Sequence, residues 1–175
     1  MKGAMSSCLA QLVETQFGKD QWEAIKRDAD AQRVAGLRLA MSDVDDAIFS
    51  RLIQSTCKVL GISAAQAADA FGEYWCCTYA PRIYKAYWVR FKSAREMILG
   101  MDQVHSEVTD DMANARPPRF EYRWENERAL VVTYQSPRDL IDLYIGLARG
   151  VGKYFQEKLS VQKLSSSQCR IRFAG

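Results

Sequence analysis

The chain has 175 residues, enough for about one domain, and its hydrophobic content of 48% is sufficient for a sizeable core. Charged residues make up 26%, the net charge is only +3, and no run of five or six basic residues occurs, which gives no support for a nucleic-acid-binding protein. No apolar stretch is long enough for a membrane-spanning helix, and we expect no signal peptide because the N-terminus lacks a long apolar segment.

The first two thirds of the chain carry helical patterns. Apolar residues recur at spacings of three and four, and Ser, Asp and Gly mark the helix ends. We expect helices over residues 4–17 and 20–28, a loop or weak helix over 29–41, and further helices from the cap at 42–45 to Gly61, from Ser63 to about Thr78, and from about Ser93 to Met112. Pro81 is expected to break the fourth of these helices before the aromatic-rich residues 83–91.

Alternation of apolar and charged residues begins after Pro117-Pro118. Phe120, Tyr122 and Trp124 alternate with charged residues and predict a half-buried strand, paired with a second strand over 129–135. Pro137 is expected to begin a helix to about Gln156, and a hairpin follows over 159–164 and 169–173. The sequence therefore predicts one α+β domain over residues 1–175: a helical half, then a small antiparallel sheet of about four strands with one inserted helix.

Five cysteines are present in the chain. Their odd number and irregular spacing do not form a disulfide framework, so we expect a reducing, cytoplasmic environment. Adjacent cysteines on a helix point about 100° apart, which is poor geometry for a disulfide or a metal site. The five are Cys8, Cys57, Cys76, Cys77 and Cys169.

His105 is the only histidine. Its helical pattern places Met101 and other apolar residues on the same face, so the imidazole is expected to point toward the interior. A buried imidazole requires a hydrogen-bond partner or a metal. Two interpretations remain open: a core histidine bonded to a backbone carbonyl, or the axial ligand of a heme iron.

Tyr134, Ser136 and Arg138 follow one another at a spacing of two. On an extended segment, all three side chains leave from one face. An Arg fork with two flanking hydroxyls is a suitable receptor for neighbouring carboxylates, such as heme propionates. The alternative is an ordinary strand end with a solvated arginine.

Taken together, these residues resemble the H-NOX family of heme nitric oxide/oxygen binding domains, which is related to the heme domain of soluble guanylate cyclase. The resemblance runs from Met1-Lys-Gly to the last strand. It is carried by five segments in matching order: Phe71-Gly-Glu-Tyr-Trp75, the His105 helix, Arg116-Pro-Pro-Arg119, Tyr134-x-Ser136-x-Arg138 and Gly146-Leu-x-x-Gly150.

The resemblance implies a heme b cofactor held between the two halves of the domain. It implies that His105 ligates the iron, that Tyr134, Ser136 and Arg138 hold the propionates, and that Pro118 presses on the porphyrin. A family zinc site near Cys169 is not expected, because no further Cys or His accompanies this residue.

The resemblance also places a set of residues on the side of the heme where the gas binds: Met5, Leu9, Trp75, Tyr79, Leu143, Ile145 and the neighbouring Tyr144. Oxygen-binding members carry a tyrosine hydroxyl at the position of Leu143. Leu143 offers no donor, so we expect NO and CO to bind without a stable dioxygen complex, unless Tyr144, Tyr79 or Trp75 supplies a donor.

The function implied is a non-enzymatic gas sensor that signals to a partner such as a histidine kinase, a diguanylate cyclase or a chemotaxis receptor. No catalytic Ser/His/Asp set or phosphate-binding glycine loop is present, and Gly146, Gly150 and Gly152 are expected to serve close helix packing. Two alternatives stay open: a heme-free interaction or scaffold domain of the same fold and, less favoured for want of a distal acid–base residue, a heme enzyme such as a peroxidase.

Overall fold

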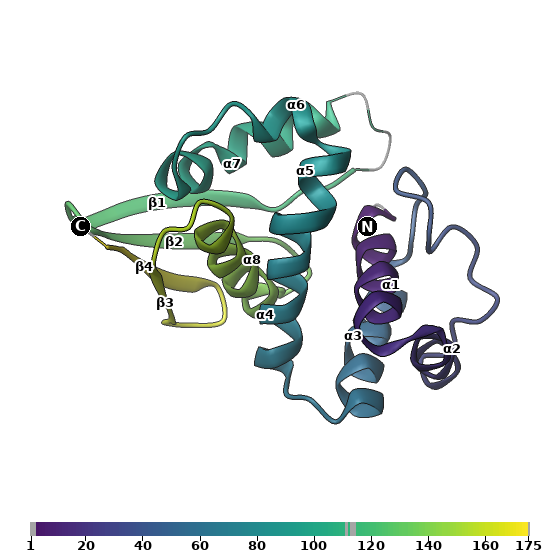
Figure 1. The fold of residues 1–175 in the computed structure, drawn as a ribbon. Helices are drawn as coiled ribbons and strands as arrows, with labels where there is room; N and C mark the ends of the chain where they lie inside the picture. Colours follow the sequence, from purple (N-terminus) through teal and green to yellow (C-terminus); the bar gives the residue numbers. More distant parts are fainter. Residues whose placement is uncertain (1–2, 111, 113–114, 175) are drawn as a thin grey trace. The chain divides into compact units, whose positions relative to one another are not determined.

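The computed structural model describes residues 3–110, 112 and 115–174 (Figure 1). The chain divides into two compact units, residues 1–67 and 68–175. No helix in the described part of the chain is long and apolar enough to cross a membrane.

The first unit is helical. Its helices bury one apolar face each, with Leu9, Trp22 and Phe49 almost fully enclosed. The Asp45 side chain caps α3 by accepting from the Ala47 amide, and the same helix ends at Gly61, whose positive φ of 65° suits glycine. The elements are α1 (Ala4–Phe17), α2 (Lys19–Asp28), α3 (Asp46–Leu60) and the beginning of α4 (Ala64–Tyr74).

The second unit combines further helices with the sheet. Phe120, Tyr134 and Ile171 are buried on one face of the sheet, and α7 and α8 contact that face. Its elements are the rest of α4, η1 (Trp75–Tyr79), α5 (Ala80–Ile83), α6 (Lys85–Trp88), α7 (Ala94–Thr109), β1 (Arg119–Asn126), β2 (Ala129–Gln135), α8 (Ile141–Tyr154), β3 (Leu159–Lys163) and β4 (Gln168–Phe173).

The four strands form one antiparallel sheet in the order β1-β2-β4-β3 (Figure 1). In the register, Tyr134 on β2 pairs with Phe120 on β1, and Leu130 pairs with Ile171 on β4. Residues that pair directly share a face, so Phe120 and Tyr134 both lie on the face covered by the helices. The predicted α+β order, with four strands and an inserted helix, is confirmed.

Two predicted helix boundaries are wrong. Pro81 does not break the helix: α4 continues through the single π turn η1 into α5, where Pro81 is the second residue. The wider π turn accommodates the proline ring, which would otherwise collide with a carbonyl one α turn earlier. Pro137 does not begin α8, which starts at Ile141, because Asp139 takes a positive φ of 49° in the intervening turn.

Helix α7, which carries His105, is also shorter than predicted. Ser93 caps α7 by accepting from the Glu96 amide, and the helix ends at Thr109 rather than Met112.

The packing role expected for the glycines is confirmed: a Cβ on Gly146 would lie 2.0 Å from the Ala68 carbonyl oxygen, and one on Gly150 would lie 2.1 Å from that of Gly72. The backbones of α4 and α8 are therefore in direct contact.

Candidate functional site

The candidate site residues come from both units. Met5 and Leu9 lie in α1 of the first unit, with Leu9 buried and Met5 half-buried. All others lie in the second unit: Trp75 and Tyr79 in η1, Met101 and His105 on α7, Pro118 directly before β1, Tyr134 on β2, Ser136 and Arg138 in the turn before α8, and Leu143, Tyr144 and Ile145 on α8.

His105 lies in the next-to-last turn of α7, beside the sheet. Its ring centroid is 5.6 Å from that of Phe120 on β1. Among the described residues, its buried Nδ1 has no hydrogen-bond partner. The residue as a whole is only half-buried, so its exposed surface lies away from Nδ1.

Burial lowers the pKa of His105 below its usual value, while the Pro118 carbonyl and the Asp102 carboxylate act in the opposite direction. The carbonyl influences the ring, yet it does not make a hydrogen bond of normal geometry to Nδ1. A core histidine that faces a backbone carbonyl therefore stays the alternative to a metal ligand. The lowered pKa favours the neutral imidazole, which is the form that ligates metals.

Three aromatic rings, those of Phe120, Tyr134 and Tyr144, form a cluster beside His105. Phe120 is buried, and its centroid lies 5.9 Å from Tyr134 and 5.0 Å from Tyr144. Burial raises the pKa of the Tyr144 hydroxyl well above its usual value. Tyr144 thus packs with Phe120 and Tyr134 on the sheet, whereas its neighbour Leu143 leaves α8 about 100° further round the helix.

The turn after β2 brings Ser136 and Arg138 together. The Arg138 amide donates to Ser136 Oγ at 3.3 Å, and Arg138 Nη1 donates to the Arg116 carbonyl at 2.5 Å. Both side chains are half-buried, and Tyr134 at the end of β2 is buried. A guanidinium and a hydroxyl in one short turn form a donor set suited to carboxylates.

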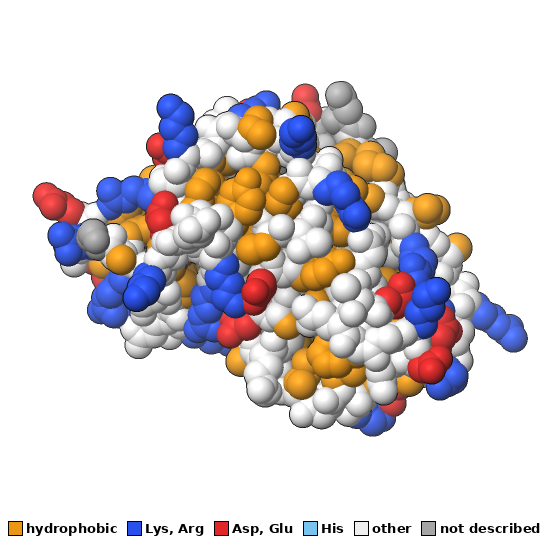
Figure 2. Space-filling model, in the orientation of Figure 1, with side chains coloured by type: hydrophobic (Ala, Val, Ile, Leu, Met, Phe, Trp, Pro, Cys, Tyr) orange, Lys and Arg blue, Asp and Glu red, His pale blue; other side chains and the backbone are white. Residues whose placement is uncertain are grey.

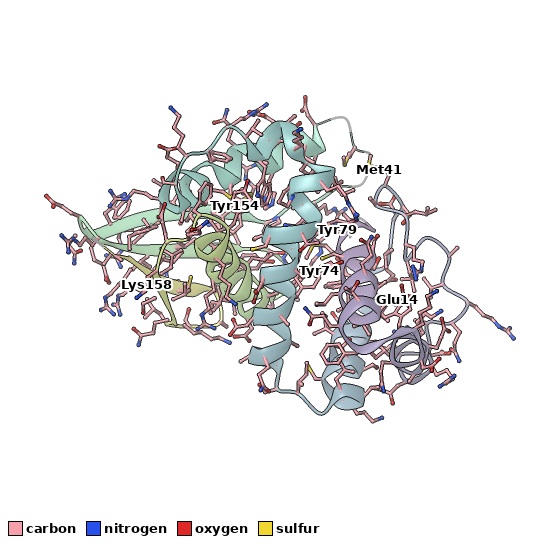
Figure 3. All side chains as sticks on the ribbon, viewed as in Figure 1. Glu14, Met41, Tyr74, Tyr79, Tyr154 and Lys158 are labelled. Atoms are coloured by element: carbon pink, nitrogen blue, oxygen red, sulfur yellow. The ribbon has the colours of Figure 1, made fainter. Side chains whose placement is uncertain are left out.

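A second aromatic group lines the π turn, whose position in the helix is marked by Tyr79 in Figure 3. Trp75 stacks between Phe71 at 5.9 Å and Tyr79 at 5.4 Å, and Tyr84 lies 6.2 Å away. Tyr79 is fully enclosed, whereas Trp75 is half-buried. Single π turns occur often at functional sites, because the extra residue redirects side chains.

Sequence reasoning missed the polar contacts around α7. Asp102, one turn before His105, accepts from Arg119 at 2.5 Å and from the Phe120 amide at 3.0 Å. Arg119 also donates to Ser106 at 2.6 Å. Arg119 belongs to the Arg116-Pro-Pro-Arg119 segment, which was the available signal, but its partner on α7 required the tertiary structure.

Other features set limits on the site. Among the described residues, no group of three or more His, Cys, Asp or Glu side chains could hold a metal ion. In Figure 2, basic and acidic side chains are interspersed over the face in view, as expected from the small net charge.

The fold carries a histidine on α7 against the sheet and an arginine–serine turn after β2, the arrangement expected of a heme-binding sensor domain. The family model for haem-NO-binding domains matches residues 2–163, and the chain belongs to that family. The family consists of heme-based gas sensors that are not enzymes, and the H-NOX assignment made from the sequence is confirmed.

Solved H-NOX structures share the fold. An H-NOX protein from S. oneidensis in the Fe(II)NO ligation state is 18% identical, with all of both chains covered and a TM-score of 0.87. A mutant from K. algicida, Fe(II) and unliganded, is 19% identical over all of this chain and 97% of that one, with a TM-score of 0.84. A mutant of the T. tengcongensis H-NOX is 22% identical over 100% and 98%, with a TM-score of 0.82.

Proposed function

We propose that residues 1–175 act as one sensor domain that binds NO, and also CO, at a heme b whose iron is ligated by His105. The observation that carries this proposal is the imidazole itself: the sole histidine is held neutral on α7, with a buried ring nitrogen that has no partner among the described residues. Heme iron supplies the gas-binding chemistry when bound. His105 would ligate that iron.

The His105→Gly variant tests this assignment. It is expected to lose heme, or to keep it only when imidazole is added, because no other histidine can take its place. Absorbance spectra of the ferrous protein provide the measurement. A histidine-type five-coordinate spectrum that persists in the variant would contradict the assignment, and a wild-type protein that takes up no heme would favour the heme-free scaffold domain.

We place the propionates on Tyr134, Ser136 and Arg138. The support is the turn that holds Ser136 and Arg138 together directly after β2. Arg138→Ala is expected to release heme to apomyoglobin about fivefold faster or more than Ser136→Ala, since a hydrogen bond from a charged group contributes about 1 kcal/mol more than a neutral one. Equal release from wild type and Arg138→Ala would remove the basis for this placement. We also place Pro118 and Met101 against the heme, on the same side as His105.

On the gas side we place Met5, Leu9, Trp75, Tyr79, Leu143 and Ile145. Leu143 carries no donor, which supports selectivity for NO and CO over dioxygen. Tyr144 is assigned instead to the sheet side, because its ring packs against Phe120 and Tyr134.

The proposed signal is a movement of α7 after loss of the iron–histidine bond. A gas ligand shifts the equilibrium only by its differential affinity for the two arrangements, and loss of the bond from His105 in one of them would supply that difference. A cytoplasmic signalling protein, such as a histidine kinase, a diguanylate cyclase or a chemotaxis receptor, would read the changed surface near residues 93–112. Hydrogen exchange over these residues, with and without NO, measures the movement.

A further inference from the structure

The contacts between α7 and β1 are confined to the part of the helix that precedes and includes Ser106. At the first turn, the Arg95 guanidinium lies 4.5 Å from the Trp124 ring and donates to the Glu127 carbonyl. One turn further, the Tyr122 hydroxyl donates to the Ile98 carbonyl at 2.7 Å. Both contacts attach the N-terminal part of α7 to the sheet.

The third contact, which we call the Asp102 clamp, consists of Asp102, Ser106, Arg119 and the amide of Phe120. Asp102 uses both carboxylate oxygens, one for Arg119 and one for the Phe120 amide, and Arg119 extends to Ser106. An exposed ion pair alone contributes little, and the Arg119 side chain is 52% exposed. The backbone bond to Phe120 is what gives the clamp its geometry, because a charged acceptor strengthens that bond.

The Asp102 clamp holds Phe120, the residue whose ring packs against His105. Its amide partner, Phe120, is buried and presents its ring to the imidazole at a centroid distance of 5.6 Å. Asp102 and Ser106 flank His105 on the helix at positions −3 and +1. Residues three apart lie on the same helix side, so Asp102 and His105 face β1 together.

Beyond Ser106 the attachment changes. Among the described residues, the only side-chain bond from the last turn of α7 to another element is the Arg90–Glu107 ion pair, which is exposed and does not involve the sheet. Thr109 donates to the His105 carbonyl of its own helix. The end of α7 therefore lacks the anchors that hold its beginning.

We propose that Asp102 is a positioning residue that would keep residues 94–106 on β1 if the bond between His105 and a heme iron were lost, so that the release of α7 would be confined to the end of the helix beyond Ser106. This inference rests on the proposed function and narrows the moving surface given there. The partner contact then falls on the end of the helix and not along its length.

The test uses the ferrous, heme-loaded full chain, with and without NO, and measures hydrogen exchange in two segments, residues 94–106 and the end of α7 beyond Ser106. Wild type is expected to show faster exchange with NO only in the second segment. In Asp102→Ala, exchange with NO should rise about tenfold or more in the first segment as well, the size expected for loss of a charge-assisted hydrogen bond. Asp102→Asn, which keeps an acceptor for the Phe120 amide, should show a smaller rise.

Glu107→Gln is the matched control, since it removes an ion pair from the same helix without touching β1, and residues 94–106 should behave as in wild type. The iron–histidine stretching band of the unliganded protein gives a second readout, and it should shift or broaden in Asp102→Ala alone. Uniform opening of residues 94–110 in wild type would overturn the clamp. Absence of any iron–histidine band in wild type would instead overturn the proposed function. The wild-type pattern decides the question even if the Ala variant fails to fold.

Discussion

Two helices of the second unit, α7 and α8, are held by contacts of different kinds. α7 meets β1 through side chains: a carboxylate, a tyrosine hydroxyl and two arginines. α8 meets α4 through directly touching backbone at Gly72, Gly146 and Gly150, with the Arg149–Asp69 and Lys153–Glu73 ion pairs beside this contact. Side chains can exchange partners with water and with one another, whereas touching backbones have no alternative arrangement at similar distance. The histidine thus lies on the adjustable helix, and Leu143 lies on the fixed one.

The largest effect on stability is expected from Gly146→Ala, which adds one methyl group where α8 touches α4. Gly146→Ala places a Cβ about where the Ala68 carbonyl already lies. Backbone must shift to make room, and we expect a loss of about 3 kcal/mol or more in the free energy of unfolding. Denaturant unfolding with heme bound provides the measurement.

Gly100→Ala on α7 is the matched control for that substitution. Its Cβ would approach only the Phe91 ring, a side chain that can rotate, and Ala gains about 1 kcal/mol over Gly in helix propensity. The change in stability should stay within about 1 kcal/mol. Equal losses in the two variants would show that the two helices are held equally rigidly.

A smaller effect is expected from Tyr122→Phe, which removes the hydroxyl that reaches the Ile98 carbonyl. The cost should be about 1 kcal/mol, the usual net value of one such hydrogen bond. Tyr87→Phe is a suitable control, since Tyr87 contacts Arg90 through its ring, which the substitution keeps. A Tyr122→Phe protein as stable as wild type would mean that this contact does not hold α7.

Thiol labelling reports whether the α8 contact opens. Cys76 is buried with its thiol 3.5 Å from the Leu147 carbonyl, whereas Cys77 is exposed. In the native protein an alkylating reagent should modify Cys77 and leave Cys76 untouched. Burial raises the pKa of the Cys77 thiol, and the thiolate is the reactive form, so the rate should still be rising with pH above pH 9. Modification of Cys76 in a native Cys77→Ser variant would show that the contact opens.

The smallest effect is expected from Tyr144→Phe. Because α8 is fixed and the Tyr144 ring lies between Phe120 and Tyr134, its hydroxyl should not reach the gas. Absorbance spectra in air should show no stable dioxygen complex for either wild type or variant. A stable complex in wild type that disappears in Tyr144→Phe would assign the donor to Tyr144, and one that disappears in Tyr79→Phe would assign it to Tyr79.

Local patterns in the sequence were sufficient for the elements and their order. The helix caps at Asp45 and Ser93 and the stop at Gly61 depend on neighbours within four residues, and all three are present in the structure. Strand alternation likewise predicted the buried side at Phe120 and Tyr122, whereas Trp124, predicted on the same side, is 40% exposed. The sole histidine and the Tyr134-x-Ser136-x-Arg138 spacing predicted the site residues, whose roles stay predictions.

Long-range packing decided the rest. The π turn at Trp75–Tyr79, the strand order β1-β2-β4-β3 and the placement of Tyr144 each depend on residues far apart in the chain. The same holds for the bond from Asp102 to the Phe120 amide, which are separated by 18 positions. A sequence pattern cannot predict this hydrogen bond, because its donor is a backbone amide and every residue except proline carries one. The chain's own residues therefore predicted His105 as the candidate heme ligand, and only the tertiary structure determined what holds that side chain in place.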